Sequence, residues 1–162
     1  MLGDGKMEII NAGVKLSEEL ICDFEKQLGI ELPHDYREFM KKNNGGEPDG
    51  NWSFDFFEFG SSEQTSSVVR YFERIYLEET MEDDDLKAGY AALLESGQIP
   101  INYLPIADDP FGNIIFLCID TKNYGKVYFG NSELEDPDTG FLVTSLISDT
   151  FSEFLDKLRP LN

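Results

Sequence analysis

The N-terminal third of the chain shows two consecutive amphipathic patterns of helical period. The first follows Ser17, which suits a helix N-cap, and Gly29 supplies a C-terminal stop. The second begins at Pro33, whose fixed φ suits the first position of a helix, and ends in Asn43-Asn44-Gly45-Gly46. We therefore predict two short helices between these boundaries.

Beyond Gly50 the spacing of the apolar residues changes to a period of two. The aromatic-rich segment 52–59 predicts a strand, and its alternation slips at Phe56-Phe57, which indicates a bulge or a strand end at that point. Apolar residues then return to helical spacing in the segments 68–76 and 86–94. Two further helices are expected there.

The C-terminal third predicts strands followed by a helix. Residues 113–120 are mainly apolar and indicate a buried strand, which a turn at 121–126 connects to a hairpin partner at 127–129. A further strand is expected at 141–147. The last helix starts with the capping box Thr150-Phe151-Ser152-Glu153 and ends before Pro160.

The predicted element order is helix pair, strand, helix pair, hairpin, strand, helix. Such separate runs of helices and hairpin-linked strands favour an α+β fold, with a single antiparallel or mixed sheet covered by helices on one face. No repeat or low-complexity linker interrupts the 162 residues. Residues 1–162 are therefore expected to form one domain.

The charge balance narrows the choice of partners. The chain has 13 Lys and Arg residues against 32 Asp and Glu residues, which gives a formal net charge of −19. A surface this negative repels phosphate backbones and anionic lipid, so binding to nucleic acid or to a membrane surface is not expected. Hydrophobic residues make up 41% of the sequence, which is enough for a core, and the charge is assigned to a folded surface.

Targeting signals and disulfides are not expected either. The first eight residues lack the basic and apolar regions of a secretory signal, and the longest apolar run, 114–119, is far too short to span a membrane. We therefore expect a cytoplasmic protein in which Cys22 and Cys118 are reduced thiols. The oligomeric state is left open by the sequence.

The sequence supports no catalytic site, cofactor or metal centre. The single histidine, His34, is expected on the solvent side of a helix, and burial in an apolar strand would keep the Cys118 thiol protonated. The acidic loops 108–113 and 120–125 lack the ligand spacing of a calcium loop, and one histidine gives no zinc site. A non-enzymatic protein is favoured. Weak incidental binding of Ca²⁺ or Mg²⁺, and an enzyme built from the many carboxylates, remain alternatives.

The acidic residues are concentrated in three stretches. Six of the eight residues 78–85 are acidic, and no basic residue occurs between Lys42 and Arg70 or between Lys126 and Lys157. These stretches are either solvated surface or a negative field that steers a basic protein partner. In the second interpretation aromatic residues supply anchors. The candidate partner-binding residues are Glu47, Asp49, Trp52, Glu78, Glu79, Glu82, Asp83, Asp84, Asp85, Asp108 and Asp109; the last two would either cap a turn or face the partner.

The second helix carries a recognisable motif. The segment Leu32-Pro33-His34-Asp35-Tyr36-Arg37-Glu38-Phe39, followed by Asn44-Gly45-Gly46, resembles the L-P-x-D-Y-x-x-F…N-G-G signature of the SUKH superfamily. This group includes the yeast cell-wall-assembly regulators and many bacterial immunity proteins. Further blocks at 104–109, 125–129 and 150–155 follow in the family's order, so the resemblance spans about residues 17–158. Thr150 replaces the more usual Ser, and the acidic segment 65–96 has no matched counterpart.

The resemblance implies an α+β fold without catalysis. For bacterial members it also implies binding and neutralisation of a cognate toxin domain, often a nuclease. We hypothesise a cytoplasmic immunity protein that covers a basic toxin domain with an acidic, aromatic-anchored surface. The alternative is a regulatory scaffold that binds an endogenous partner, as the yeast members suggest.

Overall fold

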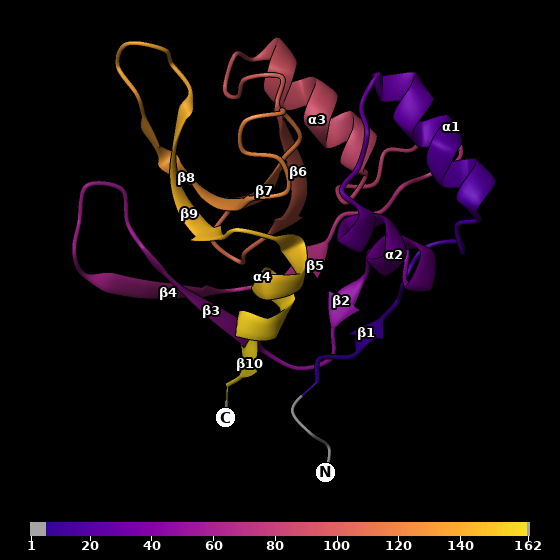
Figure 1. Ribbon diagram of the computed structural model, residues 1–162, viewed down its shortest axis with the longest axis horizontal. Coiled ribbons are helices and arrows are strands. Elements are labelled where there is room, and N and C mark those ends of the chain that lie inside the picture. Colours follow the sequence, from indigo (N-terminus) through magenta and orange to yellow (C-terminus); the bar gives the residue numbers. More distant parts are fainter. Residues whose placement is uncertain (1–5, 162) are drawn as a thin grey trace.

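The computed structural model describes residues 6–161, which form an α+β fold (Figure 1). Antiparallel strands and four helices make up this part of the chain. In chain order the elements are β1 (Ile9–Ile10), α1 (Glu18–Leu28), α2 (His34–Lys42), β2 (Glu47–Pro48), β3 (Trp52–Phe57), β4 (Gln64–Val68), β5 (Tyr71–Phe72), α3 (Leu86–Glu95), β6 (Tyr103–Asp108), β7 (Ile114–Cys118), β8 (Val127–Glu135), β9 (Leu142–Ser148), α4 (Phe151–Lys157) and β10 (Arg159–Pro160).

The strands form three sheets instead of the single sheet expected from the sequence. β1 and β2 form a small ribbon, the second sheet has the order β10-β3-β4, and the third has the order β5-β6-β7-β8-β9. The division follows from the segment between β3 and α3. Its first part, β4, pairs with β3, whereas its second part, β5, pairs with β6. The chain therefore leaves one sheet and enters another within a few residues.

The same segment corrects a predicted helix. Residues 68–76 were expected to be helical, but they contain the end of β4 and all of β5. Val69, Phe72 and Ile75 are buried at intervals of three residues, which imitates helical spacing. Pairing with β3 on one side and β6 on the other determines the extended backbone, because tertiary context overrides a short periodic pattern.

The strand β6 was not predicted. Pro105 lies within it, although proline cannot donate a hydrogen bond to a strand ladder. The structure accommodates it next to a register shift between Pro105 and Ala107 in the pairing with β7. The other predicted elements are confirmed: α1, α2, α3, α4, β3, β7, β8 and β9 lie where the sequence placed helices and strands, and β3 ends at Phe57, where the alternation slips.

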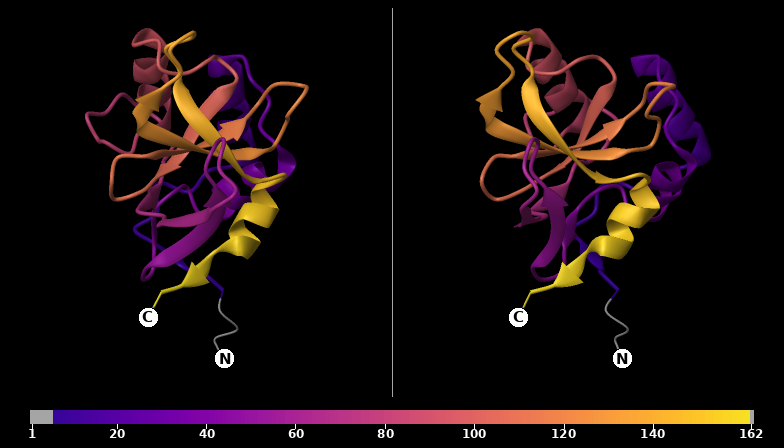
Figure 2. Two further views of the ribbon diagram at one scale, coloured as in Figure 1. Left: turned by 90° about the vertical axis from the view of Figure 1, so that its left-hand side faces the viewer. Right: turned by 60° about the vertical axis from the view of Figure 1, so that its left-hand side comes forward.

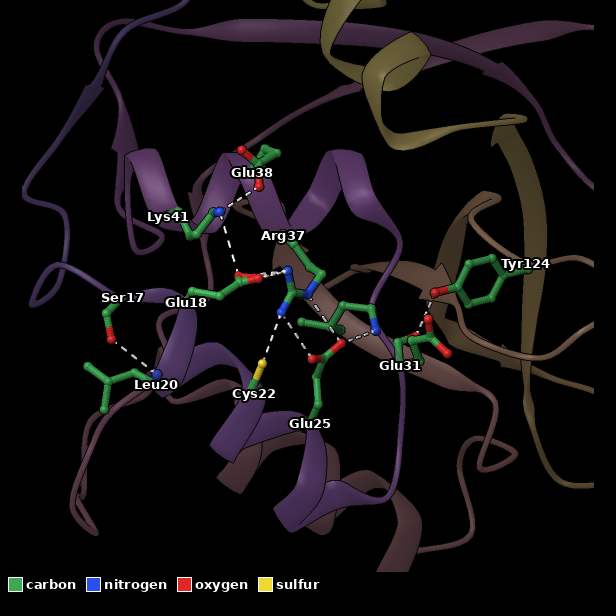
Figure 3. Close-up of polar contacts among 11 residues, drawn as sticks. Ser17, Glu18, Leu20, Cys22, Glu25, Glu31, Arg37, Glu38, Lys41 and Tyr124 are labelled. Carbon is green, nitrogen blue, oxygen red and sulfur yellow. Dashed lines mark hydrogen bonds and ion pairs between the residues drawn. The ribbon is translucent and has the colours of Figure 1, made fainter.

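Arg37 connects the first two helices (Figure 3). Its guanidinium donates to Glu18 Oε1 at 2.6 Å and to Glu25 Oε1 at 3.3 Å, and it also contacts Cys22 Sγ at 3.4 Å. Glu25 Oε2 accepts a further hydrogen bond from the backbone N–H of Leu32 at 2.7 Å. The side chain of Arg37 is only 14% exposed, so this network is a partly buried clamp between α1 and α2.

Aromatic rings join the helices to the sheets. The ring centroid of Phe39 on α2 lies 4.9 Å from that of Phe72 and 5.0 Å from that of Phe151 on α4. Phe154 of α4 lies 5.4 Å from Phe54 of β3. Helix α4 thus packs against α2, β3 and β9 (Figure 1), and in the turned views it lies at the periphery of the molecule (Figure 2). The Phe39–Phe72 contact is tilted and the other two are edge-to-face, and all three add to the apolar burial that holds the layers together.

Candidate protein-docking surface

A groove opens between the acidic segment that follows β5 and two helices. It has a volume of about 660 Å³, and we call it the acidic groove. Its lining residues come from α1, from the segment 76–81 and from the start and outer face of α3. They are Gln27, Tyr76, Leu77, Glu78, Glu79, Thr80, Met81, Asp85, Lys87, Ala88 and Ala91.

The acidic groove combines apolar and charged surface. Met81 is 99% exposed and Leu77 is 53% exposed, although both are large apolar side chains. Glu78 and Glu79 lie beside them in the same lining, and Lys87, the one basic lining residue, donates to Gln27 Oε1 at 2.8 Å. Exposed apolar side chains flanked by carboxylates suit a protein partner that brings apolar and basic groups together.

The acidic run 78–85 divides into a free part and a structural part. The side chains of Glu78, Glu79, Glu82 and Asp83 are exposed, and no hydrogen bond or ion pair engages them within residues 6–161. Asp84 instead pairs with Arg74 at 3.1 Å and accepts a hydrogen bond from the hydroxyl of Tyr76 at 2.6 Å. Its carboxylate is therefore already occupied.

Asp85 belongs to the structural part as well. It is 7% exposed and forms the N-cap of α3, because its Oδ1 accepts a hydrogen bond from the backbone N–H of Ala88 at 3.2 Å. The N-cap satisfies one of the backbone donors that a helix start leaves free. Only the first part of the run offers carboxylates to a partner.

Asp108 and Asp109 have intramolecular partners. Asp108 forms an ion pair with Arg70 at 2.6 Å, and its burial raises the pKa of its carboxyl while the arginine opposes that rise. Asp109 is 1% exposed and accepts four hydrogen bonds, from Ser67 Oγ (2.7 Å), from the N–H of Phe111 (2.9 Å) and from the N–H (2.8 Å) and side chain (3.0 Å) of Asn113. These contacts correspond to the turn-capping alternative.

The remaining candidates lie apart from the acidic groove, on β2, in the connection after it and at the start of β3. Trp52 is 7% exposed and its Nε1 donates to the carbonyl of Asp49 at 2.9 Å. Glu47 accepts a hydrogen bond from Asn11 Nδ2 at 2.7 Å, and Asp49 is exposed. None of the three lines the groove. Trp52 packs in the interior, so it supplies little surface to a partner.

Exposed aromatic residues occur elsewhere. Phe57, Phe59 and Phe111 are 54%, 77% and 78% exposed, whereas Phe56 is 4% exposed. The signal for Phe57 was present in the sequence, since the slip in alternation places it on the opposite side of β3 from Phe56. The slip was interpreted there as a bulge or a strand end, not as exposed aromatic surface.

One buried acid stands out among the titratable groups. Glu73 is 9% exposed, and burial, reinforced by the negative charges of Asp108 and Asp84, raises the pKa of its carboxyl to about 9. The hydroxyl of Tyr36, which is fully buried, has no hydrogen-bond partner in the described chain. At neutral pH the carboxyl of Glu73 is therefore protonated.

Metal and membrane features were also searched. Among residues 6–161, no three His, Cys, Asp or Glu side chains are arranged to hold a metal ion. The helices in that range are all too short or too polar to cross a membrane. The two cysteines are free thiols, with Cys118 buried in β7, and burial raises the pKa of its thiol as expected.

Comparison with known proteins identifies the family. Residues 15–157 match the model of the SMI1/KNR4 family (SUKH-1). The chain belongs to this family. The SPbeta prophage-derived uncharacterized protein YokK of Bacillus subtilis (strain 168) is 28% identical to the chain over 167 aligned residues, which cover 95% of this chain and 78% of YokK. The family match includes the segment that forms the acidic groove, so this segment is part of the SUKH-1 domain.

Proposed function

We propose that this SUKH-1 protein is a non-enzymatic, cytoplasmic immunity protein that binds and neutralises a basic toxin domain. Membership of the SUKH-1 family and similarity to a prophage-derived protein support an immunity role. The observation that carries the choice of partner is the acidic groove, in which free carboxylates surround exposed Leu77 and Met81. A basic partner with an apolar contact would match both features.

The groove would act in two steps. The net charge of −19 and the free carboxylates attract a basic domain, which raises association rates by about 10 to 1,000-fold at low salt. Met81 and Leu77 then lose water against the partner and slow its dissociation. If the partner is a nuclease, the carboxylates occupy positions that substrate phosphates would otherwise take.

The experiment is co-expression with the polymorphic toxin encoded beside the gene. We expect the wild-type protein to restore growth. Survival no better than with the toxin alone overturns the proposal, and capture of a chromosomally encoded housekeeping protein without protection supports a regulatory scaffold instead.

Matched charge variants test the groove itself. The variant E78Q/E79Q/E82Q removes three free carboxylates beside the groove, and the control E8Q/E31Q/D156N removes three exposed carboxylates that do not line it. We expect the groove variant to slow toxin association at least tenfold at low salt, with a smaller effect at high salt, and the control to slow it much less. Equal effects of the two variants would contradict docking at the groove.

A further inference from the structure

The strand β4 is an unpaired edge of its sheet. It is the last strand in the order β10-β3-β4. The N–H of Val69 donates to the carbonyl of Trp52 at 3.0 Å, and the register continues from this pair through Phe54–Ser67 and Phe56–Thr65. Because hydrogen bonding alternates along an antiparallel ladder, the N–H and C=O groups of Gln64 and Ser66 point away from β3.

These outward groups have no partner in the described chain. Neither Gln64 nor Ser66 takes part in a hydrogen bond with any segment other than β3 among residues 6–161, and both are exposed. The edge also lacks the usual protection. Its sequence, Gln-Thr-Ser-Ser-Val, contains no charged residue and no proline, whereas natural proteins block free edges with such residues.

Acidic and aromatic side chains surround this edge. The β3–β4 connection carries Glu58, Phe59 and Glu63, which are exposed, and exposed Phe57 is the last residue of β3. No Lys or Arg occurs between Lys42 and Arg70. A partner strand on β4 would therefore meet negative charge and uncovered aromatic surface.

A second acidic hairpin lies on the same side of the molecule. The N–H of Phe59 donates to Ser145 Oγ of β9 at 2.9 Å, which fastens the end of β3 to the five-stranded sheet. The loops of the β3–β4 and β8–β9 hairpins project from this side (Figures 1 and 2). The end of β8 bears exposed Glu133 and Glu135, and the loop that follows it bears exposed Asp138. The two stretches without Lys or Arg, 43–69 and 127–156, thus come together on this side of the molecule, away from the acidic groove.

We propose that the free edge of β4 binds an extended, basic segment of a partner protein as an additional strand. Main-chain hydrogen bonds to Gln64 and Ser66 would hold the segment, and its Lys or Arg side chains would face the neighbouring carboxylates. A second copy of this chain is disfavoured as the occupant, because each copy carries −19 and would bring Glu58 and Glu63 against their equivalents. This surface is distinct from the groove and does not require the partner to be a toxin.

A synthetic peptide tests the inference. The probe is a seven-residue peptide of alternating Lys and Val with blocked ends, and its control has the same sequence with an N-methyl group on every residue, so that neither edge of the control has an N–H to donate. We expect the probe to slow hydrogen exchange of the Ser66 amide at least tenfold, and the methylated peptide that cannot pair to bind at least tenfold more weakly. Absence of binding, or equal binding of the two peptides, would overturn the inference, since the second result means charge attraction alone.

A variant of the edge provides the second test. Ser66→Pro removes an outward N–H without touching the bonds of Thr65 and Ser67 to β3, and proline is tolerated on edge strands. We expect at least tenfold weaker binding of the probe by S66P and unchanged binding by the control S66T, with Thr65 and Ser67 amides still protected in both. Unchanged binding by S66P contradicts strand addition. A dimer of the free protein that S66P abolishes would also contradict it, by identifying a second copy as the occupant.

Discussion

The side-chain amide of Asn44 forms two hydrogen bonds with the main chain of Ile75. Nδ2 donates to the carbonyl of Ile75 at 2.8 Å, and Oδ1 accepts from its N–H at 2.8 Å. Nδ2 also donates to the carbonyl of Val14 at 2.9 Å, and Asn44 is 2% exposed. One amide thus connects the exit of α2, the N-terminal segment and the chain just before the acidic groove.

Asn44→Asp is expected to destabilise the fold by about 2–4 kcal/mol, because a carboxylate would face the carbonyls of Ile75 and Val14 without a proton to donate. Urea unfolding measures the change. The control is Asn43→Asp, at the neighbouring position where the side chain makes no hydrogen bond in the described chain, and it should cost less than 1 kcal/mol. Equal losses for the two variants would show that the paired amide is not the cause.

The raised pKa of Glu73 leads us to expect that the stability of the fold depends on pH. Its pKa is about 9 in the folded protein and near 4.3 in an unfolded chain. The folded state therefore holds a proton that the unfolded state has released between these values. The stabilisation is complete below about pH 4 and is lost as the pH rises toward 9, by at most about 1.4 kcal/mol per pH unit.

Glu73→Gln tests this sign, because glutamine keeps the shape of the neutral acid and does not titrate. The stability difference between E73Q and the wild type, measured by urea unfolding from pH 5 to 9, should increase in favour of E73Q with rising pH. The exposed control Glu63→Gln should give no such trend. A constant difference for E73Q would mean that Glu73 titrates normally in the fold.

Local patterns predicted those elements whose signals lie within a single segment. Ser17 and Thr150 cap helices as expected, with hydroxyl oxygens that accept hydrogen bonds from Leu20 and Glu153. The helix predicted around Phe72 was wrong, because pairing with β3 and β6 determines the backbone there and both strands are distant in sequence. Apolar residues at intervals of three positions do not distinguish a helix from an extended segment that passes from one sheet to another.

The candidate site shows the same limit. The free carboxylates Glu78, Glu79 and Glu82 were identified from composition, but the sequence alone could not separate them from Asp85, which caps a helix. Whether an aromatic side chain can contact a partner or belongs to the core depends on its burial. Trp52 is buried and belongs to the core, whereas Phe57 is exposed and can contact a partner. Gly45 illustrates a residue whose role is visible only in three dimensions, since a Cβ there would lie 2.4 Å from the carbonyl oxygen of Glu73.

Asp109 is expected to be required for stability. Asp109→Ala removes the buried carboxylate that accepts hydrogen bonds from Ser67 Oγ and from the N–H groups of Phe111 and Asn113, and should cost about 2–4 kcal/mol. Thermal unfolding of D109A measures this loss. Glu133→Ala, at an exposed carboxylate, is the control and should lie within about 0.5 kcal/mol of the wild type. A stable D109A that fails only in partner binding would favour a partner-facing role for Asp109.

The two parts of the acidic run should separate in stability measurements. Asp85→Ala removes the N-cap of α3 and is expected to lower the free energy of unfolding by about 0.5–2 kcal/mol. Asp84→Asn, as a separate variant, is also expected to lower it, because Arg74 keeps its charge without a counterion. E78Q/E79Q/E82Q should change stability by less than about 0.5 kcal/mol, because these side chains form no hydrogen bond or ion pair within residues 6–161 and the remaining negative charge repels less. Urea unfolding compares the variants under one condition. A triple variant as unstable as D85A would mean that the free carboxylates hold the segment in place, and a slower association with a partner could then reflect a disordered groove instead of a lost charge.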